Sequence, residues 1–207
     1  MELNQFRKKF SGHTPTLLNH RGCSAVLVPL VEQDGELCLL YEVRSASVSQ
    51  PGEVCFPGGR MEAGETAIQC ALRETDEELG IAESDIEIIG ELDFLYIRGD
   101  RLLYPVLAKL NPSALAQMAP VPNEVSDTFL VPLSWLRDNP PTFYRHRQEA
   151  DMPEFPYADA GIRPDYRWAR HFAEIPIYHG LPHILWGMTA RITYYLLQDL
   201  YEENGST

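Results

Sequence analysis

The chain of 207 residues lacks any run of about 18 consecutive apolar residues, the length that a membrane-spanning helix needs. Positive charge is also scarce, because 17 Lys and Arg stand against 30 Asp and Glu, for a formal net charge of −13. A general nucleic-acid-binding protein would normally carry a basic surface. We therefore expect neither a membrane nor a nucleic-acid partner, and an anionic substrate would need cations supplied locally.

Cysteine is sparse, and no two of the four cysteines form a CxxC pair. This spacing argues against a disulfide framework or a zinc site and favours buried thiols in a reducing compartment. Cys70, one turn before Glu74, has a less favoured alternative as a soft metal ligand. The first ten residues lack the apolar centre of a secretory leader. We expect a cytoplasmic protein.

The length fits one domain, or one domain with a large insertion. Residues 1–20 predict a short amphipathic helix and a linker, and residues 21–207 predict the domain itself. Within it, residues 138–165 are rich in proline and charge and predict a loop or extra hairpin that lids the site. Its basic spot, residues 145–147, either offsets phosphate charge or is a solvated strand end.

Apolar runs separated by turn residues predict strands and hairpins. One hairpin is expected over 24–42, and another over 86–110 with its turn at 98–101. Residues 111–122 contain three prolines and predict a loop, 131–136 a strand and short helix, and 166–168 and 171–178 further strands. A final helix is expected over 184–203, with Ile184, Met188, Ile192, Tyr195 and Leu196 on one stripe.

Residues 59–81 organise the rest of the chain and read as a glycine-rich loop that leads into an acidic helix. Thr66 is the expected N-cap, and Gly80 is the expected stop after about Leu79. At roughly 100° per residue, Glu74, Glu77 and Glu78 share one arc of the helix. Ile68, Ala71, Thr75 and Leu79 form the neighbouring arc, which predicts the buried face.

Two interpretations of the acidic arc stand side by side. An acidic helix face is commonly solvated, but such a face would usually intersperse lysines, and this helix has only Arg73. A divalent cation explains the arc better, because Mg²⁺ binds carboxylate oxygens together with substrate phosphates.

The pattern resembles the Nudix box, G-x5-E-x7-R-E-U-x-E-E-x-G-U, in which U is a bulky aliphatic residue. All glycine, glutamate and arginine positions match, as does Ile81, and the one departure is Thr75 at the first U. The resemblance implies a Nudix α/β/α sandwich with a mixed β-sheet. It also implies a small nucleotide-type substrate with a diphosphate linkage, Mg²⁺ or Mn²⁺ as cofactor, and a homodimer as one possible state.

The same resemblance assigns roles to individual residues. Glu74 and Glu78 would be the core metal ligands, and Glu77 a third ligand or the residue that orients and deprotonates water. Glu65 and the carbonyl of Gly58 would complete the metal shell. Arg73 would hold Glu77 or Glu65 in place, as metal sites commonly require.

The flanking segment 39–60, LLYEVRS followed by PGEVCFPGGR, is similar to the signature of coenzyme A diphosphatases, a Nudix subgroup. Arg44, Gly58 and Gly59 would then contact the substrate, or Arg44 would support the box, and a surface arginine at a strand end is the less favoured alternative for Arg44. The segment departs from the signature in two ways. The gap between Arg44 and Gly52 is one residue shorter, and Ser49 and Gln50 stand where the signature usually has a basic residue. The phrase LWGMTARI at 185–192 resembles the end of the same subgroup and is interpreted as core packing, with Arg191 bridging to the sheet.

Glu124 begins a phrase, EV…VPLSWL, that resembles Nudix chains in which the loop before this strand supplies a glutamate near the reaction centre; the alternative is an exposed loop-end acid. Taken together, the motifs predict hydrolysis of coenzyme A or acyl-coenzyme A to 3′,5′-ADP and 4′-phosphopantetheine. One alternative is an ADP-ribose or dinucleotide diphosphatase, because the basic residue is missing. The other is a non-catalytic Nudix module that senses a nucleotide, although such modules typically lose box carboxylates.

Overall fold

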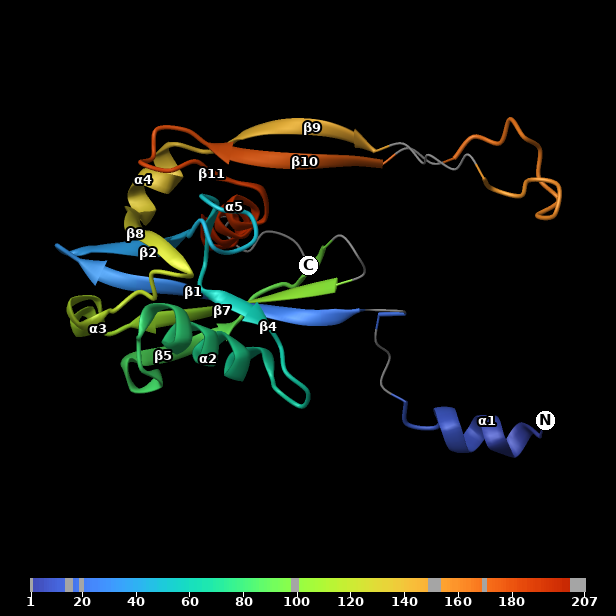
Figure 1. Ribbon diagram of the computed structural model, residues 1–207, viewed down its shortest axis with the longest axis horizontal. Helices are drawn as coiled ribbons and strands as arrows, with labels where there is room; N and C mark the ends of the chain where they lie inside the picture. The colour runs from blue at the N-terminus through green and yellow to red at the C-terminus, as the bar shows by residue number, and fades with distance from the viewer. Residues whose placement is uncertain are drawn as a thin grey trace.

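The computed structural model describes residues 2–13, 17–18, 21–97, 101–148, 154–168 and 171–201 (Figure 1). Its central sheet is built from β1 (Gly22–Gln33), β2 (Glu36–Arg44), β3 (Val54–Cys55), β4 (Gly58–Arg60), β5 (Ile86–Glu91), β6 (Leu95–Ile97), β7 (Arg101–Leu110) and β8 (Val125–Pro132). The helices are α1 (Leu3–Phe10), α2 (Ala67–Leu79), α3 (Pro112–Gln117), α4 (Leu133–Asp138) and α5 (Gly187–Tyr201), with a 3-10 turn η1 (Glu83–Asp85). A second sheet contains β9 (Thr142–Gln148), β10 (His171–Tyr178) and β11 (Leu185–Trp186).

The central sheet has the strand order β3-β2-β1-β7-β5, with β4 also pairing with β1, β6 with β7 and β8 with β2. β1 and β7 run parallel, and the other pairs of this sheet are antiparallel. The predicted mixed sheet is therefore confirmed.

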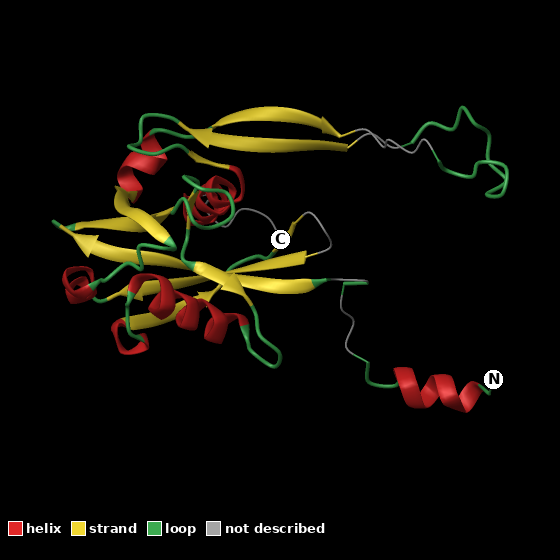
Figure 2. Ribbon diagram, in the orientation of Figure 1, coloured by secondary structure: helices red, strands yellow, loops and turns green. Residues whose placement is uncertain are grey.

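Alternating residues of β1 divide the core into two layers, as expected from the period of two along a strand. Ala25 and Leu27 belong to the cluster shared with α2, whereas Val28 belongs to the cluster shared with α5. Figure 2 shows α2 and α3 on one face of the central sheet, and α5 and the second sheet on the other. The α/β/α sandwich is thus also confirmed.

Local signals fix both ends of α2. The Thr66 hydroxyl accepts a hydrogen bond from the backbone N–H of Gln69, whose side chain in turn accepts from the Thr66 N–H, and this forms a capping box. Gly80 ends the helix in the left-handed conformation at φ 66°. Thr75 stands where the Nudix box usually has a bulky aliphatic residue. Its polar side chain can be buried because its hydroxyl donates a hydrogen bond to the Ala71 carbonyl at 2.6 Å.

Two expected elements were wrong in detail. The predicted loop at 111–122 contains α3, because Asn111 caps it and Pro112 occupies the first turn, where a missing N–H does no harm. The final helix begins at Gly187 and not at Ile184, because Leu185 and Trp186 pair with β10. The expected stripe is also wrong in part: Ile192 and Leu196 are buried, but Ile184, Met188 and Tyr195 are exposed.

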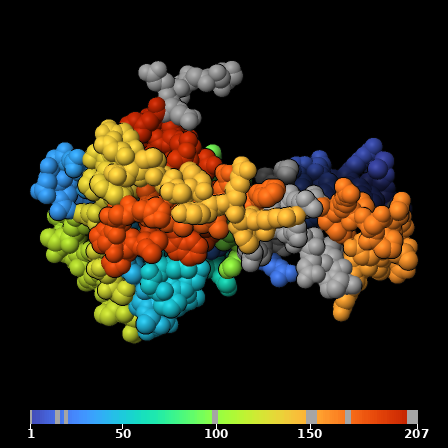
Figure 3. Space-filling model, turned by 90° about the horizontal axis from the view of Figure 1, so that it is seen from above, coloured from blue at the N-terminus to red at the C-terminus, as the bar shows by residue number. Residues whose placement is uncertain are grey.

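The segment expected to be a loop or hairpin lid begins with β9, which pairs antiparallel with β10 along its length. Arg145 lies within β9, where it forms an exposed ion pair with Glu174. Residues 166–168 do not form the predicted strand; the Trp168 ring instead makes T-shaped contacts with the rings of Phe155 and Tyr166. Figures 1 and 3 show residues 154–168 at one end of the molecule, away from α2, and the closing of a lid stays a prediction.

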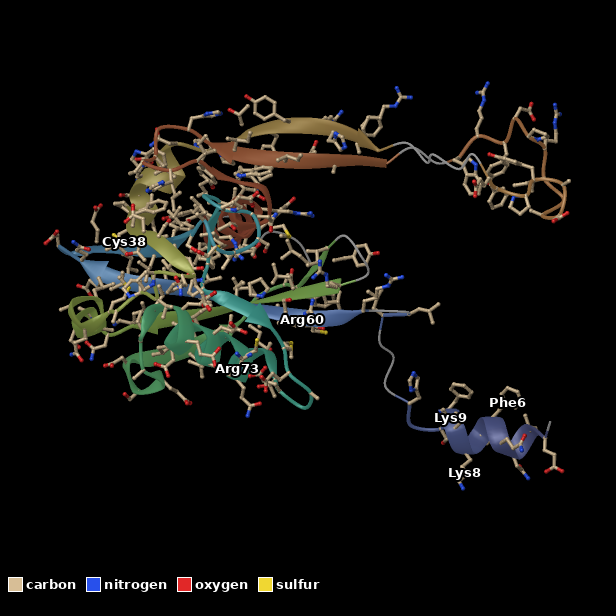
Figure 4. The ribbon with its side chains drawn as sticks, viewed as in Figure 1. Phe6, Lys8, Lys9, Cys38, Arg60 and Arg73 are labelled. Atoms are coloured by element: carbon tan, nitrogen blue, oxygen red, sulfur yellow. The ribbon has the colours of Figure 1, made fainter. Side chains whose placement is uncertain are left out.

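The predicted N-terminal helix is present as α1, and its apolar residues Leu3, Phe6 and Phe10 are all exposed. Figure 4 shows Phe6, Lys8 and Lys9 projecting from it. Within the described part of the chain, no helix is long and apolar enough to cross a membrane. The turn expected at 98–101 falls mainly on residues 98–100, which lie outside the described residues.

Candidate active site

Arg73 on α2 is the centre of the acidic arc. Its guanidinium forms ion pairs with Glu65 Oε1 at 3.0 Å, Glu74 Oε1 at 2.9 Å and Glu77 Oε2 at 3.0 Å. It also donates to the carbonyl of Arg60 on β4 at 3.3 Å, and Figure 4 labels both arginines. The sequence predicted that Arg73 would hold Glu77 or Glu65; the structure shows contacts with both and with Glu74 as well.

The carboxylates of the arc differ widely in exposure. The side chains of Glu65 and Glu74 are 12% and 17% exposed, and Glu78 is buried, whereas Glu77 is 57% exposed. The arc is therefore not a uniformly solvated face. Glu77 lies at its open rim, where water has direct access.

The glycine-rich loop packs directly on these carboxylates. The backbone N–H of Gly58 donates to Glu78 Oε2 at 2.8 Å. A Cβ atom at Gly59 would collide with the carboxylate of Glu74, and one at Gly58 would collide with the Ala25 carbonyl. Glycine is required at Gly58, because a Cβ there would collide with backbone atoms and φ is 155°, whereas at Gly59 the collision is with the flexible end of the Glu74 side chain.

Burial dominates the electrostatics of Glu78. The pKa of Glu78 is raised to about 8, mainly by burial and next by the carboxylate of Glu42, whereas the Gly58 hydrogen bond opposes the rise. Burial likewise raises the pKa of Glu74, although Arg73 opposes the shift. For Glu65, by contrast, the hydrogen bond from Arg73 lowers the pKa.

Glu42 on β2 is a member of this group that the sequence analysis missed. It is 1% exposed; Oε1 accepts a hydrogen bond from Cys55 Sγ at 3.0 Å, and Oε2 has no partner among the described residues. Burial raises its pKa to about 7. The available signal was a lone acid inside the apolar run of residues 37–43, because unpaired acids are rarely buried without a function.

Glu124 is exposed on the turn before β8, as the simpler interpretation expected. Its carboxylate nevertheless raises the pKa of Glu42, Glu74 and Glu78, so it lies in the same neighbourhood. Its backbone carbonyl accepts the Ser45 N–H at 2.8 Å, which ties this turn to the end of β2.

Arg44 is half-buried and braces the loop that follows β2. Its Nε donates to the Ser49 carbonyl at 2.7 Å and its Nη2 to the Ser49 hydroxyl at 3.3 Å. Its backbone carbonyl also accepts the Gly52 N–H at 2.9 Å. Arg44 is therefore more than a surface arginine, because it shapes the segment that carries the expected substrate signature.

A cleft of about 380 Å³ lies beside the glycine-rich loop. Its walls include Arg44, Gly58 and Gly59, together with Trp186 and Met188 at the start of α5. Sequence analysis interpreted the phrase at 185–192 as core packing, and this was wrong for Trp186 and Met188, which are exposed in the cleft. Among the described residues, no hydrogen bond or ion pair joins Arg191 to the sheet as expected; its guanidinium lies 5.8 Å from the centre of the Tyr195 ring.

Comparison with known proteins identifies the family. The NUDIX domain model matches residues 22–155. This chain belongs to the Nudix hydrolase family. It is 33% identical over 198 residues to the mitochondrial coenzyme A diphosphatase NUDT8 of Homo sapiens, a match that covers 94% of this chain and 76% of that protein.

One further relative and one solved structure are also similar to this chain. The peroxisomal coenzyme A diphosphatase NUDT7 of Mus musculus is 37% identical over 123 residues, 58% of this chain and 51% of its own. The crystal structure of a MutT/nudix family protein from Enterococcus faecalis covers 99% of this chain and 72% of its own, with 15% identity and a TM-score of 0.51, and shows the fold alone. This Nudix hydrolase is therefore an enzyme of the Nudix diphosphatase type.

Nudix hydrolases generally use divalent metal ions, and the donor chemistry here suits one. The oxygens of Glu42, Glu74 and Glu78 are the hard ligands that Mg²⁺ prefers. The partnerless Oε2 of buried Glu42 and the raised pKa values show that this negative charge is poorly compensated. No three His, Cys, Asp or Glu side chains of the described residues already converge as a metal-binding group, and Arg73 holds Glu65, Glu74 and Glu77 instead.

Proposed function

We propose that this Nudix hydrolase cleaves the diphosphate of coenzyme A or acyl-coenzyme A and releases 3′,5′-ADP and 4′-phosphopantetheine. One observation carries the proposal: three separate segments that resemble coenzyme A diphosphatases meet at a single cleft. These segments are the signature around Arg44, the glycine-rich loop at 58–59 and the phrase that begins at Leu185. The names of the human and mouse relatives favour the same substrate class.

The carboxylates of Glu78 and Glu74 lie against Gly58 and Gly59, which line this cleft. Glu74 and Glu78 would hold Mg²⁺ or Mn²⁺, with Glu65 and the Gly58 carbonyl completing the shell. When bound, such an ion supplies Lewis-acid polarisation of the phosphate and lowers the pKa of a water. Arg73 positions the carboxylates through its three ion pairs.

The remaining residues divide binding and proton transfer between them. Glu77 is open to solvent at the rim and would orient the attacking water and accept its proton, with Glu124 as the second candidate for this role. Gly58 and Gly59 let the diphosphate approach the backbone closely, and Arg44 contacts its charge from the neighbouring wall. Attack of the water oxygen on phosphorus breaks the anhydride P–O bond and leaves two phosphate monoesters.

One observation favours an ADP-ribose or dinucleotide diphosphatase as the second candidate: the segment from Ser45 to Gly52 contains no basic residue. A nucleotide that lacks the 3′-phosphate of coenzyme A would need no additional cation from this segment. A non-catalytic sensor is less favoured, because every carboxylate of the Nudix box is present.

The deciding experiment is a substrate panel with product identification by mass spectrometry. The purified chain is incubated with coenzyme A, acetyl-coenzyme A, ADP-ribose and a diadenosine polyphosphate, with Mg²⁺ or Mn²⁺. We expect 3′,5′-ADP and 4′-phosphopantetheine from coenzyme A at the highest kcat/KM. Faster release of AMP from ADP-ribose would instead establish the second candidate. An absence of turnover throughout, with nucleotide binding retained, would establish the sensor.

Location and assembly remain proposals. We propose a cytoplasmic enzyme, although the human relative is named mitochondrial. Imaging of the tagged chain in its own cell tests the first point. Light scattering after gel filtration tests whether the chain forms the homodimer that the resemblance implies.

A further inference from the structure

We propose that Arg101 and Trp186 form a subsite that binds the adenine nucleotide end of the substrate, with Arg101 on the ribose 3′-phosphate and Trp186 on the base. This inference rests on the proposed function, because it names the part of the substrate that the cleft selects. Both residues line the cleft with Gly58 and Gly59, and neither was identified as functional from the sequence.

Strand geometry places Arg101 in the cleft. Arg101 begins β7, two residues before Leu103, so their side chains emerge from the same face of the sheet. Leu103 packs in the core layer shared with α5, which is the face that the cleft occupies. Pairing with Ile97 on β6 and Gly22 on β1 fixes the backbone of Arg101 on both sides.

Of the two arginines that line this cleft, Arg101 has more free donors among the described residues. The other arginine in its wall, Arg44, uses Nε and Nη2 on Ser49 and directs Nη1 at Cys55. Among the described residues, Arg101 has neither an ion pair nor a hydrogen bond from its side chain. Arginine suits phosphate because its planar fork can donate two hydrogen bonds at once. Arg101 therefore supplies, from a different strand, the charge that Ser49 and Gln50 do not.

Trp186 offers a stacking surface on the opposite wall. Its backbone pairs with Ile177 on β10, and Gly187 follows with φ 67°, which turns the chain into α5. The indole remains 39% exposed although it belongs to a strand, and Met188 beside it is 45% exposed. Stacking of a nucleobase on an aromatic side chain is favourable whatever the base.

The positions of the lining residues predict how the substrate lies in the cleft. Gly58 and Gly59 form the end that touches Glu78 and Glu74, and the volume of about 380 Å³ lies within the range for small-molecule sites. The diphosphate would lie at the glycine end, and the nucleotide would extend toward Arg101. Glu53 also lines the cleft and disfavours anions, so the phosphate must rely on Arg101.

The kinetic test compares coenzyme A with 3′-dephospho-coenzyme A. We expect the wild type to prefer coenzyme A in kcat/KM by roughly tenfold or more, the range for a charged hydrogen bond. Arg101→Ala should bring the ratio of the two kcat/KM values close to one, and Arg101→Lys should keep part of the preference. Arg145→Ala is the matched control, because Arg145 is an exposed arginine of β9 that does not line this cleft.

A binding test without metal or turnover separates this inference from the proposed function. The affinities of 3′,5′-ADP and 5′-AMP are measured by calorimetry and by tryptophan fluorescence, with thermal melts to confirm that each variant is folded. We expect tighter binding of 3′,5′-ADP, loss of that difference in Arg101→Ala, and loss of fluorescence quenching in Trp186→Phe.

The outcomes are distinguishable. If the wild type cleaves coenzyme A and Arg101→Ala leaves the ratio of kcat/KM for coenzyme A to that for 3′-dephospho-coenzyme A unchanged, the subsite is overturned and the proposed function stands. No turnover, combined with an Arg101-dependent preference for 3′,5′-ADP, would overturn the proposed function and support the subsite. Equal binding of 3′,5′-ADP and 5′-AMP by the wild type would overturn the subsite.

Discussion

Glu78 Oε2 accepts a hydrogen bond at 2.8 Å from the backbone N–H of Gly58, which joins the acidic helix to the glycine-rich loop across 20 residues of sequence. The contact holds a buried carboxylate at the end of the cleft where Gly58 and Gly59 form the wall. Glu78 is therefore fixed in position, whereas Glu77, one residue earlier, remains exposed at the rim. The two acids can therefore serve different purposes in the proposed mechanism, with Glu78 as a buried metal ligand and Glu77 as a solvent-exposed base.

Glu78→Gln should reduce kcat by about a thousandfold, which corresponds to roughly 4 kcal/mol of transition-state stabilisation. Gln keeps the volume and an oxygen for the Gly58 N–H, so the melting temperature of the metal-free protein should not fall. Glu83→Gln, an exposed acid on η1, is the control and should have wild-type activity. Steady-state kinetics with Mn²⁺ titration measures the effect, and an unaltered kcat would refute the assignment of Glu78.

Gly59→Ala should separate activity from stability. The added Cβ would collide with the carboxylate of Glu74, which is the flexible end of a side chain and can move aside. We expect weaker Mn²⁺ binding and a fall in kcat/KM of at least about tenfold, equivalent to roughly 1.4 kcal/mol, with little change in melting temperature.

Gly90→Ala provides the matched control for this substitution. A Cβ at Gly90 would have no atom within 4 Å, and Gly90 has no positive φ, so both activity and metal binding should be retained. Electron paramagnetic resonance of Mn²⁺ reports the binding directly. Equal Mn²⁺ affinity in the two alanine variants would contradict a metal site beside Gly59.

Arg73→Gln should destabilise the metal-free protein, because Glu65, Glu74 and Glu77 would then repel one another without compensation. Arg73 is 27% exposed, so solvent screening limits the loss in free energy of unfolding to about 1–2 kcal/mol. Saturating Mg²⁺ should reduce this loss. Arg163→Gln, which removes an exposed ion pair with Asp165, should change stability by less than about 0.5 kcal/mol.

Much of α2 could be predicted from sequence because its signals are local. Thr66 caps the first turn of the helix and Gly80 ends its last turn, and the spacing of Arg73 and Glu77 places them one turn apart. The same locality explains the confirmed hairpin of β1 and β2, whose turn is Asp34-Gly35.

The cleft could not be predicted because its residues meet only through tertiary packing. Trp186 was expected within a helix, but pairing of its backbone with β10 overrode the helical pattern and left the indole in the cleft. Glu42 was read as part of an apolar strand, and its partner Cys55 and its neighbour Glu78 come from β3 and α2. Arg101 was assigned to a turn, and only its register on β7 shows which wall it occupies.

The buried carboxylates predict an unusual dependence of stability on pH in the chelated protein. The pKa of Glu78 is raised to about 8 and that of Glu42 to about 7, both mainly by burial, whereas an unfolded glutamate titrates near about 4.3. Between these values the folded state binds more protons than the unfolded state, so stability falls as pH rises. The free energy of unfolding in EDTA should therefore be larger at pH 5.5 than at pH 8.5.

Glu42→Gln isolates one part of this dependence, because it removes one of the two raised groups and preserves side-chain volume. Urea unfolding of the variant in EDTA should show a shallower decline between pH 5.5 and 8.5 than the wild type. Mg²⁺ at pH 8.5 should restore stability to the wild type, since a divalent cation binds the ionised carboxylates and not the unfolded chain. NaCl at equal ionic strength is the control for screening. If stability in EDTA rose with pH, the carboxylates would be ionised and well compensated, and the argument that a cation is needed beside Glu78 would fail.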